Sequence, residues 1–233
     1  MSLRNSALVR RSIPAHTGGM NTGSVMIESP TVIVLTDPGL NAGARGTDQA
    51  LSHYSVLDTA LRRVLSSRMP RVLVTTPDLA HAASALLPGQ DIIALSPPSP
   101  SQTHSDWLAC CVATGVLQRP STTGWLLLPS DMPMLEVRTL HAVADGLREA
   151  PIAYPCHRHL RGHPVGLSSE LHADLIRVRG DHDLRRITAR YPSIDIDVDD
   201  AGVLMTLDAH SGLNQFRAQM SGPYAQGPQS RPF

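Results

Sequence analysis

LLLPSDMP, from Leu126 to Pro133, joins a short apolar strand to a turn that carries one carboxylate, Asp131. The proline at position 133 disfavours the helical conformation of the residue before it, so the chain turns away and leaves Asp131 at the carboxyl end of the strand. An apolar run without alternation is typical of a strand covered on both faces of a parallel sheet. The stretch therefore predicts a buried parallel strand with an acidic side chain at its tip.

The same pattern, a short apolar run followed by a helical segment, repeats along the chain. Further strands are predicted at Thr31–Leu35, Arg71–Thr75, Asp91–Leu95, Pro151–Tyr154, Ile194–Val198 and Val203–Leu207. Helices are predicted at Ser55–Ser67, after Thr76-Pro77, and at Ser105–Leu117, Glu136–Arg148, Ser169–Val178, Asp183–Arg190 and Ser211–Met220. This alternation predicts an α/β fold with a three-layer, mostly parallel, Rossmann-like sheet. Ligands of such sheets bind at the carboxyl ends of the strands.

A single domain is expected to hold the strand and helix pattern, over residues 31–220. Residues 1–30 are expected to form a disordered N-terminal extension, and residues 221–233, which are rich in Pro, Gly and Gln, a flexible tail. The hydrophobic share of 42% and the charged share of 17% are ordinary for a soluble globular protein.

The charge balance argues against two classes of partner. The formal net charge is zero, so no basic field indicates binding to a nucleic acid or to an anionic membrane. All 20 basic residues are arginine, so cationic contacts to a phosphate must come from arginine or a metal. The three cysteines do not make a disulfide framework, which favours a reducing, cytoplasmic compartment.

A carboxylate at the tip of a buried strand suits Mg²⁺, which takes oxygen ligands and keeps several waters and substrate phosphates. Asp131 is the candidate ligand. The alternative is an ordinary turn residue ahead of the helix that begins at Glu136. The local pattern leaves both interpretations open.

Several motifs in order along the chain resemble those of the molybdenum-cofactor nucleotidyltransferases, a family with a nucleotide-sugar-transferase-like fold. LLLPSDMP resembles the metal-binding turn of that family, and Arg161-Gly162-His163-Pro164-Val165 resembles its Gly-His-Pro segment. Arg179-Gly180-Asp181 with Arg185 resembles its Gly-Asp-x-Gly-x-Arg stretch. Gly202-Val203-Leu204, leading to Leu207-Asp208-Ala209, resembles the closing motif. The similarity extends from about Thr31 to Met220.

This resemblance implies transfer of a nucleoside monophosphate from CTP or GTP to molybdopterin with release of pyrophosphate. The Gly-His-Pro segment is more typical of the cytidylyltransferases, so CTP is favoured. The reaction would use Mg²⁺, because phosphoryl transfer needs positioning and charge neutralisation above all. The resemblance implies that Asp131 and Asp208 hold this ion. A molybdoenzyme or its chaperone is an expected partner.

The resemblance also assigns the remaining site residues. Catalysis would use Asp131 with Arg45, and the nucleotide would contact Leu35, Gly39, Gly43, Arg45, Gly46, Gln49 and Ser105. The acceptor would contact Arg161, Gly162, His163, Pro164 and Asp181. Ordinary helix capping is the alternative for Ser105 and Asp181, and a purely structural turn is the alternative for His163.

The opening loop, Leu35 to Leu51, departs from the family pattern. Gln49 falls where the family has a lysine that meets the triphosphate, Asp48 adds a negative charge beside it, and Pro38 removes one backbone N–H. A charge-assisted hydrogen bond is worth roughly 1.5–3 kcal/mol, so this loss weakens triphosphate binding by about one to two decades. Gln49 is expected to recover part of it as a neutral donor, and Arg45 to recover more.

Two further interpretations therefore stay open. A catalytically inactive homologue would keep the pocket and carry a pterin or a nucleotide during molybdoenzyme maturation. A sugar-phosphate nucleotidyltransferase would keep the chemistry with another acceptor. The run Cys156-His157-Arg158-His159, with His157 and His159 sharing one face of an extended segment, resembles a zinc-ligand cluster, but a substrate-facing loop is favoured because no second cysteine pair completes such a site.

Overall fold

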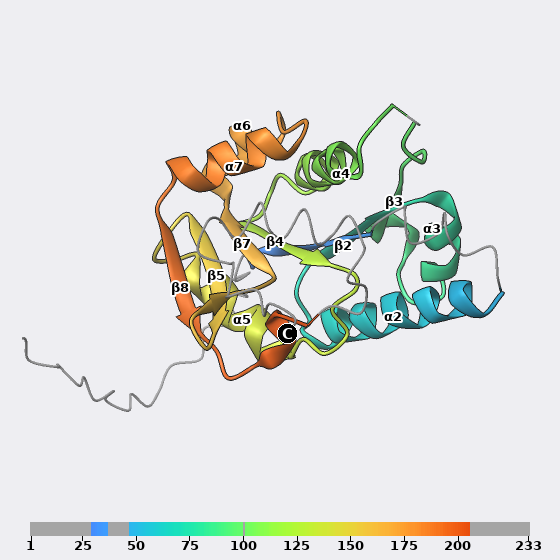
Figure 1. The fold of residues 1–233 in the computed structure, drawn as a ribbon, viewed down its shortest axis with the longest axis horizontal. Coiled ribbons are helices and arrows are strands. Elements are labelled where there is room, and N and C mark those ends of the chain that lie inside the picture. Colours follow the sequence, from blue (N-terminus) through green and yellow to red (C-terminus); the bar gives the residue numbers. More distant parts are fainter. Residues whose placement is uncertain (1–28, 37–46, 100, 206–233) are drawn as a thin grey trace, which may run out of the picture.

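An eight-stranded sheet runs through the computed structural model, which describes residues 29–36, 47–99 and 101–205 (Figure 1). Its strands are β1 (Thr31–Leu35), β2 (Arg71–Thr75), β3 (Ile92–Ala94), β4 (Gly124–Pro129), β5 (Ile152–His157), β6 (Leu160–Arg161), β7 (Val165–Ser168) and β8 (Ser193–Asp197). The order in space is β3-β2-β1-β4-β7-β5, and both β6 and β8 pair with β5. Only β6 and β7 of these strands run antiparallel to their neighbours. The prediction of a mostly parallel α/β sheet is confirmed.

Helices cover both faces of the sheet (Figure 1). One face carries α4 (His104–Gln118), α6 (His172–Leu175) and α7 (Asp181–Arg190). The other face carries α2 (Thr47–Ser66), α3 (Pro77–Ala83) and α5 (Val137–Gly146). Short 3₁₀ turns are η1 (Gly89–Asp91), η2 (Ser169–Leu171) and η3 (Ala201–Val203).

Alternation along each central strand divides the core into two halves. In β1, Ile33 and Leu35 pack toward α4, whereas Val32 and Val34 pack toward α2. All four side chains are fully buried, and burying one such side chain stabilises the fold by roughly 1.5–3 kcal/mol. Since the central strands bury both faces, their sequences are continuous apolar runs.

Several predicted elements differ from the structure. The expected helix start at Ser55 is wrong, because α2 already begins at Thr47. Asp58, the expected partner in a capping box there, pairs instead with Arg62 one turn later, with 2.7 Å between Oδ2 and Nε. The expected helix over Ser169–Val178 is two short pieces, η2 and α6.

The other differences concern strands. The antiparallel strands β6 and β7 were not expected, because their short sequences lack a long apolar run. The predicted strand at Val203–Leu207 is wrong in its described part, where η3 includes Val203 and Leu204 follows it as the C-cap. The predicted helix at Ser211–Met220 lies outside the described residues.

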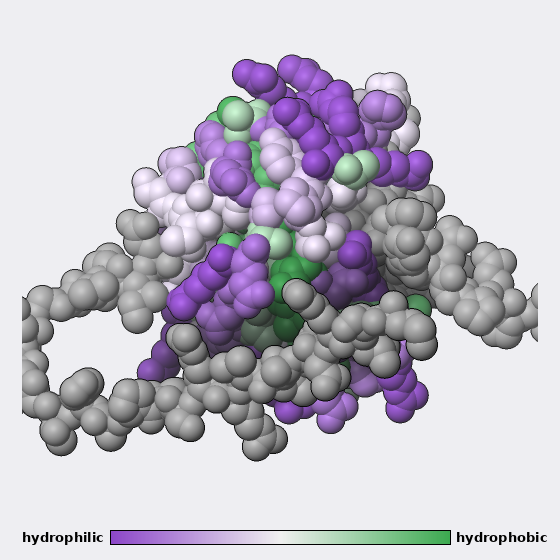
Figure 2. Space-filling model, turned by 90° about the vertical axis from the view of Figure 1, so that its left-hand side faces the viewer, coloured by the Kyte–Doolittle hydropathy of each residue, from purple (hydrophilic) through white to green (hydrophobic). Residues whose placement is uncertain are grey.

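Strand β8 ends one side of the sheet. Exposed Ser193, Asp195 and Asp197 alternate along it with half-buried Ile194 and Ile196. Charged side chains on an edge strand disfavour pairing with another chain. Figure 2 looks onto this side of the molecule, and its surface is mostly hydrophilic, with a small apolar area between the hydrophilic parts.

Among the described residues, no helix has both the length and the apolarity to cross a membrane.

Candidate functional site

The carboxyl ends of β1, β2 and β4 lie side by side because these strands are parallel. The backbone N–H of Ser130 donates to the carbonyl of Leu35 over 2.9 Å, so the β1–β4 ladder continues one residue beyond β4. Asp131 follows directly and is only 2% exposed. The structure thus places Asp131 at the edge where sheets of this kind bind ligands.

The turn that follows Asp131 is held by the core. Met132 and Leu135 are each 1% exposed and pack in the same half of the core as α2. Arg63 of α2 donates from Nε to the carbonyl of Pro133 over 3.0 Å. Burial of residues on both sides of the turn and this hydrogen bond fix the position of Asp131.

Gly162, His163 and Pro164 break one antiparallel strand into β6 and β7. Both pieces pair with β5, and the residues between them make a bulge in the ladder. The N–H of Gly162 donates to the carbonyl of Pro155 over 2.8 Å, and the peptide bond between His163 and Pro164 is cis. His163 is 1% exposed. Because β7 starts where β4 ends, this bulge lies at the same edge as Asp131.

The segment from Asp200 to Val203 contacts both the turn and the bulge. The N–H of His163 donates to the carbonyl of Val203 over 3.0 Å. Gly202 lies so close to the backbone of Met134 that a Cβ at position 202 would come within 2.4 Å of the Met134 carbonyl oxygen. The turn that carries Asp131 and the bulge that contains His163 are therefore connected through one short segment.

Asp200 is a buried carboxylate next to this region that the sequence prediction missed. Its carboxylate is 3% exposed and accepts from the backbone N–H groups of Glu136 and Gly202 and from the hydroxyl of Thr139. The pattern Asp200-Ala201-Gly202 is a turn signature, so a turn was foreseeable. Its hydrogen-bond partners at 136 and 139 were not foreseeable, because they are distant in the sequence.

Ser105 and Asp181 lie at the starts of two neighbouring helices. The cap of α4 is Thr103, which forms a capping box with Asp106, so the alternative of Ser105 as the helix cap is wrong. Ser105 is the second residue of α4, within its first turn, and is 5% exposed. Asp181 is the first residue of α7, and its side chain lies outside the described set. A Cβ on Gly180 would come within 2.7 Å of Asp106 Oδ1, so the two helix starts are in contact.

Arg161 makes contacts within the sheet. Its guanidinium pairs with Asp195 at 2.6 Å and lies over the ring of Tyr154, 4.5 Å from the ring centre. Burial raises the pKa of Tyr154 to about 12, and the charge of Arg161 opposes this rise. An acceptor would reach Arg161 only by competing with these contacts.

Three threonines gather at the carboxyl ends of β1 and β2. The hydroxyl of Thr36 donates to the hydroxyl of Thr75 over 2.8 Å. Thr76 is 3% exposed, and its hydroxyl has no hydrogen-bond partner within the described part of the chain. Thr76 begins α3 as its N-cap, with Pro77 next, as the sequence predicted.

Removing the hydrogen-bonded hydroxyl of Thr75 and the unbonded hydroxyl of Thr76 is expected to change the stability of the protein differently. Thr75→Val removes the acceptor of Thr36 and is expected to destabilise the protein by about 1 kcal/mol. Thr76→Val removes a buried hydroxyl without a partner, so it is expected to be neutral or stabilising by up to about 1 kcal/mol. Urea unfolding of both variants tests this. Equal losses of stability in the two variants would contradict the assignment.

The run Cys156 to His159 does not form the face that was expected of it. β5 ends at His157, and a tight turn follows, with φ of 50° at Arg158 and 66° at His159. Nδ1 of His157 lies 3.1 Å from the carbonyl oxygen of Val198. The two histidines therefore do not alternate along one extended segment. Within the described ranges no three His, Cys, Asp or Glu side chains converge as metal ligands.

The three cysteines are expected to react at different rates with iodoacetamide at pH 8. Cys110 is exposed, whereas Cys111 and Cys156 are buried. Burial raises the pKa of the Cys156 thiol, and nearby Asp195 and Asp197 add to this rise, so less of the reactive thiolate is present at a given pH. Mass spectrometry of the folded protein should show Cys110 alkylated first, and all three alkylated in urea. Equally fast labelling of Cys156 in the folded state would contradict this.

Not all of the predicted site residues fall within the described part of the chain. Gly39, Gly43, Arg45, Gly46 and Asp208 lie outside the described residues. Gln49 falls in the first turn of α2, and its side chain is likewise outside them. The side chain of Leu35 is fully buried in the core, so a ligand could contact this residue only through its backbone.

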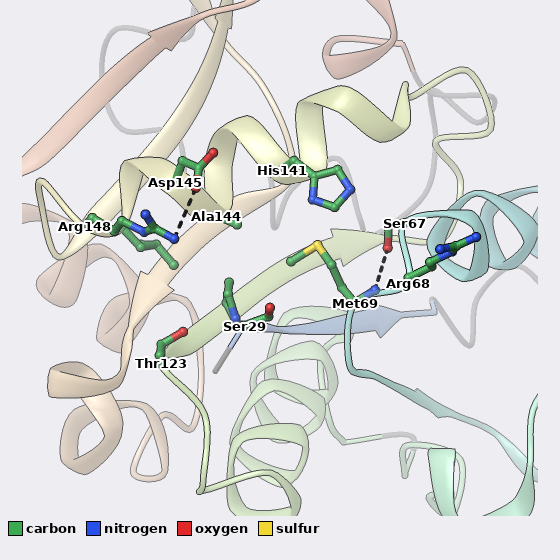
Figure 3. Close-up of a pocket in the computed structure, with 11 residues that line it drawn as sticks. Ser29, Ser67, Arg68, Met69, Thr123, His141, Ala144, Asp145 and Arg148 are labelled. Carbon is green, nitrogen blue, oxygen red and sulfur yellow. Dashed lines mark hydrogen bonds and ion pairs between the residues drawn. The ribbon is translucent and has the colours of Figure 1, made fainter. Parts of the chain in front are cut away.

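A cavity of about 290 Å³ lies at the opposite edge of the sheet (Figure 3). Ser29, Met69 and Thr123, which line it, come just before β1, β2 and β4. In Figure 3, His141, Asp145 and Arg148 of the α5 region lie along the other wall. None of the predicted site residues belongs to this cavity, because they follow the strands rather than precede them.

Comparison with known proteins gives a family match over the body of the chain. The model of the MobA-like NTP transferase domain matches residues 49–194. No curated protein is similar enough to match the chain.

Solved structures share the fold. The crystal structure of Rv0371c from Mycobacterium tuberculosis H37Rv has a TM-score of 0.60 and 20% identity, covering 79% of this chain and 94% of that one. The same protein in complex with manganese has a TM-score of 0.59 and 18% identity, covering 83% and 98%. CMP:2-keto-3-deoxy-manno-octonic acid synthetase complexed with CTP has a TM-score of 0.51 and 14% identity, covering 73% and 90%. At these identities the likeness establishes the fold alone.

Proposed function

Because the chain belongs to the MobA-like NTP transferase family, we propose that it transfers a nucleoside monophosphate from an NTP to molybdopterin and releases pyrophosphate. CTP is favoured over GTP as the donor. The proposal is supported by the buried carboxylate of Asp131 at the carboxyl edge, in a turn that is connected to the His163 bulge through the segment 200–203.

A divalent cation fits the residues at this edge. Asp131 offers one carboxylate beside a strand end, which suits an ion that keeps waters and phosphate oxygens as its other ligands. Asp208 would supply a second carboxylate. The manganese complex of Rv0371c, which has the same fold, supports a divalent ion in this role, and we favour Mg²⁺. When bound, the ion would neutralise charge on the transferred phosphate.

The nucleotide would lie over the ends of β1 and β2. Its contacts would be the backbone after Leu35, the glycines at 39, 43 and 46, the side chains of Arg45 and Gln49, and Ser105 at the start of α4. Thr76 joins this set, because its buried hydroxyl lies at the same edge without a described partner. Arg45 would replace part of the charge that the family lysine supplies. The fold shared with a synthetase that was solved with CTP is consistent with a cytidine nucleotide.

The acceptor would lie on the side of the bulge. Gly162, His163 and Pro164 would contact it directly, and Asp181 would approach from the start of α7. Arg161 would take part only by releasing Asp195. The residues at both sides would hold the acceptor phosphate oxygen in line with the bond between the α-phosphorus and the leaving pyrophosphate. Positioning of this kind supplies most of the catalysis in phosphoryl transfer. The product would pass to a molybdoenzyme or its chaperone.

Pyrophosphate release by the full chain tests the proposal. The protein is incubated with Mg²⁺ and one of CTP, GTP or ATP, and with molybdopterin, a sugar 1-phosphate or no acceptor. Release is expected with molybdopterin, and fastest with CTP. Release only with the sugar phosphate would identify the other acceptor class. Tight binding of the pterin without any release of pyrophosphate would overturn the proposed enzyme activity and indicate a carrier.

A further inference from the structure

We propose that Asp200 is a positioning residue that sets the place of Asp131 relative to His163. The inference rests on the proposed function, because it assigns a task to Asp200 within the same site. Asp200 itself does not touch the reacting groups in this scheme. It acts through the turn after β4 and through the bulge between β6 and β7.

The carboxylate of Asp200 accepts three hydrogen bonds. Oδ2 accepts from the backbone N–H of Glu136 over 2.9 Å and from the hydroxyl of Thr139 over 2.6 Å. Oδ1 accepts from the N–H of Gly202 over 2.8 Å. Both partners at 136 and 139 belong to the start of α5, which the Asp131 turn leads into. Asp200 therefore ties the segment 200–203 to the end of that turn.

The segment passes this constraint to both halves of the site. Gly202 packs against the carbonyl of Met134, inside the turn. One residue later, the carbonyl of Val203 accepts from His163 in the bulge, and a Cβ on Gly162 would come within 2.4 Å of the same oxygen. The turn and the bulge are thus spaced by a single short piece of backbone, which Asp200 fixes.

Position 200 requires a carboxylate rather than an amide. All three partners of Asp200 donate, and an ionised carboxylate only accepts. An asparagine would point its NH₂ group either at Gly202 N–H or at the pair of donors from α5. In each orientation at least one buried donor loses its acceptor. The segment would then shift, and a displacement on the order of 1 Å far from the reacting atoms can cost on the order of 100-fold in rate.

Asp200→Asn and Thr139→Val test this role, with Asp199→Asn as the matched control on an exposed neighbour. Steady-state kinetics with Mg²⁺, CTP and molybdopterin give kcat and the KM for CTP. Calorimetry gives the affinity for Mg²⁺·CTP, and circular dichroism with thermal unfolding reports folding. Asp200→Asn is expected to lower kcat on the order of 10–100-fold, more than KM changes, and to weaken Mg²⁺·CTP binding several-fold. Thr139→Val should show a smaller loss in the same direction.

The outcomes separate this inference from the proposed function. If the wild-type chain releases no pyrophosphate with any nucleotide, the proposed function fails. The role of Asp200 is then tested by the affinity for Mg²⁺·CTP alone, compared between Asp200→Asn and Asp199→Asn. If Asp200→Asn stays folded and matches Asp199→Asn in kcat and in affinity, the positioning role is overturned while the function stands. Should Asp200→Asn fail to fold, wild-type kcat and affinity in Thr139→Val would overturn the role.

Discussion

Replacing Asp131 with asparagine is expected to reduce pyrophosphate release by on the order of 100–1,000-fold. A metal ion contributes several kcal/mol to such a reaction, and each 1.36 kcal/mol corresponds to a factor of about ten in rate. Asparagine keeps the size of the side chain but removes the charge that would hold the ion. Since Asp131 is 2% exposed between anchored residues, the change should leave the backbone of the turn in place.

A charge-matched control is available at the other edge of the sheet. Asp145 lines the cavity that lies away from the site, and its side chain is 71% exposed. Asp145→Asn removes the same charge from the protein and should retain wild-type turnover. Undiminished pyrophosphate release by a folded Asp131→Asn variant would show that this carboxylate does not hold the ion.

The second large effect is expected from Gly202→Ala. The new Cβ would lie 2.4 Å from the carbonyl oxygen and 2.6 Å from the carbonyl carbon of Met134, so backbone must move. Overpacking of this kind typically destabilises by about 1–3 kcal/mol. A protein of this size then loses on the order of 2–4 °C in Tm for each kcal/mol. Activity should fall as well, because the displaced atoms belong to the turn that carries Asp131.

Gly89→Ala is the matched control for that change. A Cβ at position 89 meets nothing within 4 Å, so its effect on the free energy of unfolding should stay within about 0.5 kcal/mol. Urea unfolding curves of the two variants give the comparison directly. Equal stability of both alanine variants would mean that Gly202 and Met134 are not in close contact.

Much of the fold could be predicted from local sequence. β1, β2 and β4 are continuous apolar runs of strand length, and this signal depends on no distant residue. β6 and β7 were missed because their pairing partners, not their own sequences, make them strands. The start of α2 was placed late because an i,i+4 ion pair at Asp58 was interpreted as a cap. The family and the nucleotidyltransferase class inferred from the motifs are confirmed by the family match.

The position of a candidate site residue was predictable only where one motif holds all the information. Asp131 is placed by its own strand and by the proline two residues later, and the structure has it at the expected edge. Asp200 could not be found this way, since two of its three hydrogen-bond donors lie more than 60 residues earlier in the chain. Arg161 matched the motif, but its contacts with Tyr154 and Asp195 depend on how β5, β6 and β8 pair.

Binding of Mn²⁺ together with CTP, followed by electron paramagnetic resonance, tests whether Asp131 holds a divalent ion and a nucleoside triphosphate at the carboxyl edge of the sheet. The wild-type chain should take up Mn²⁺ when CTP is present, and Asp131→Asn should leave the ion with the free nucleotide. Equal uptake by the two proteins would contradict this role of Asp131.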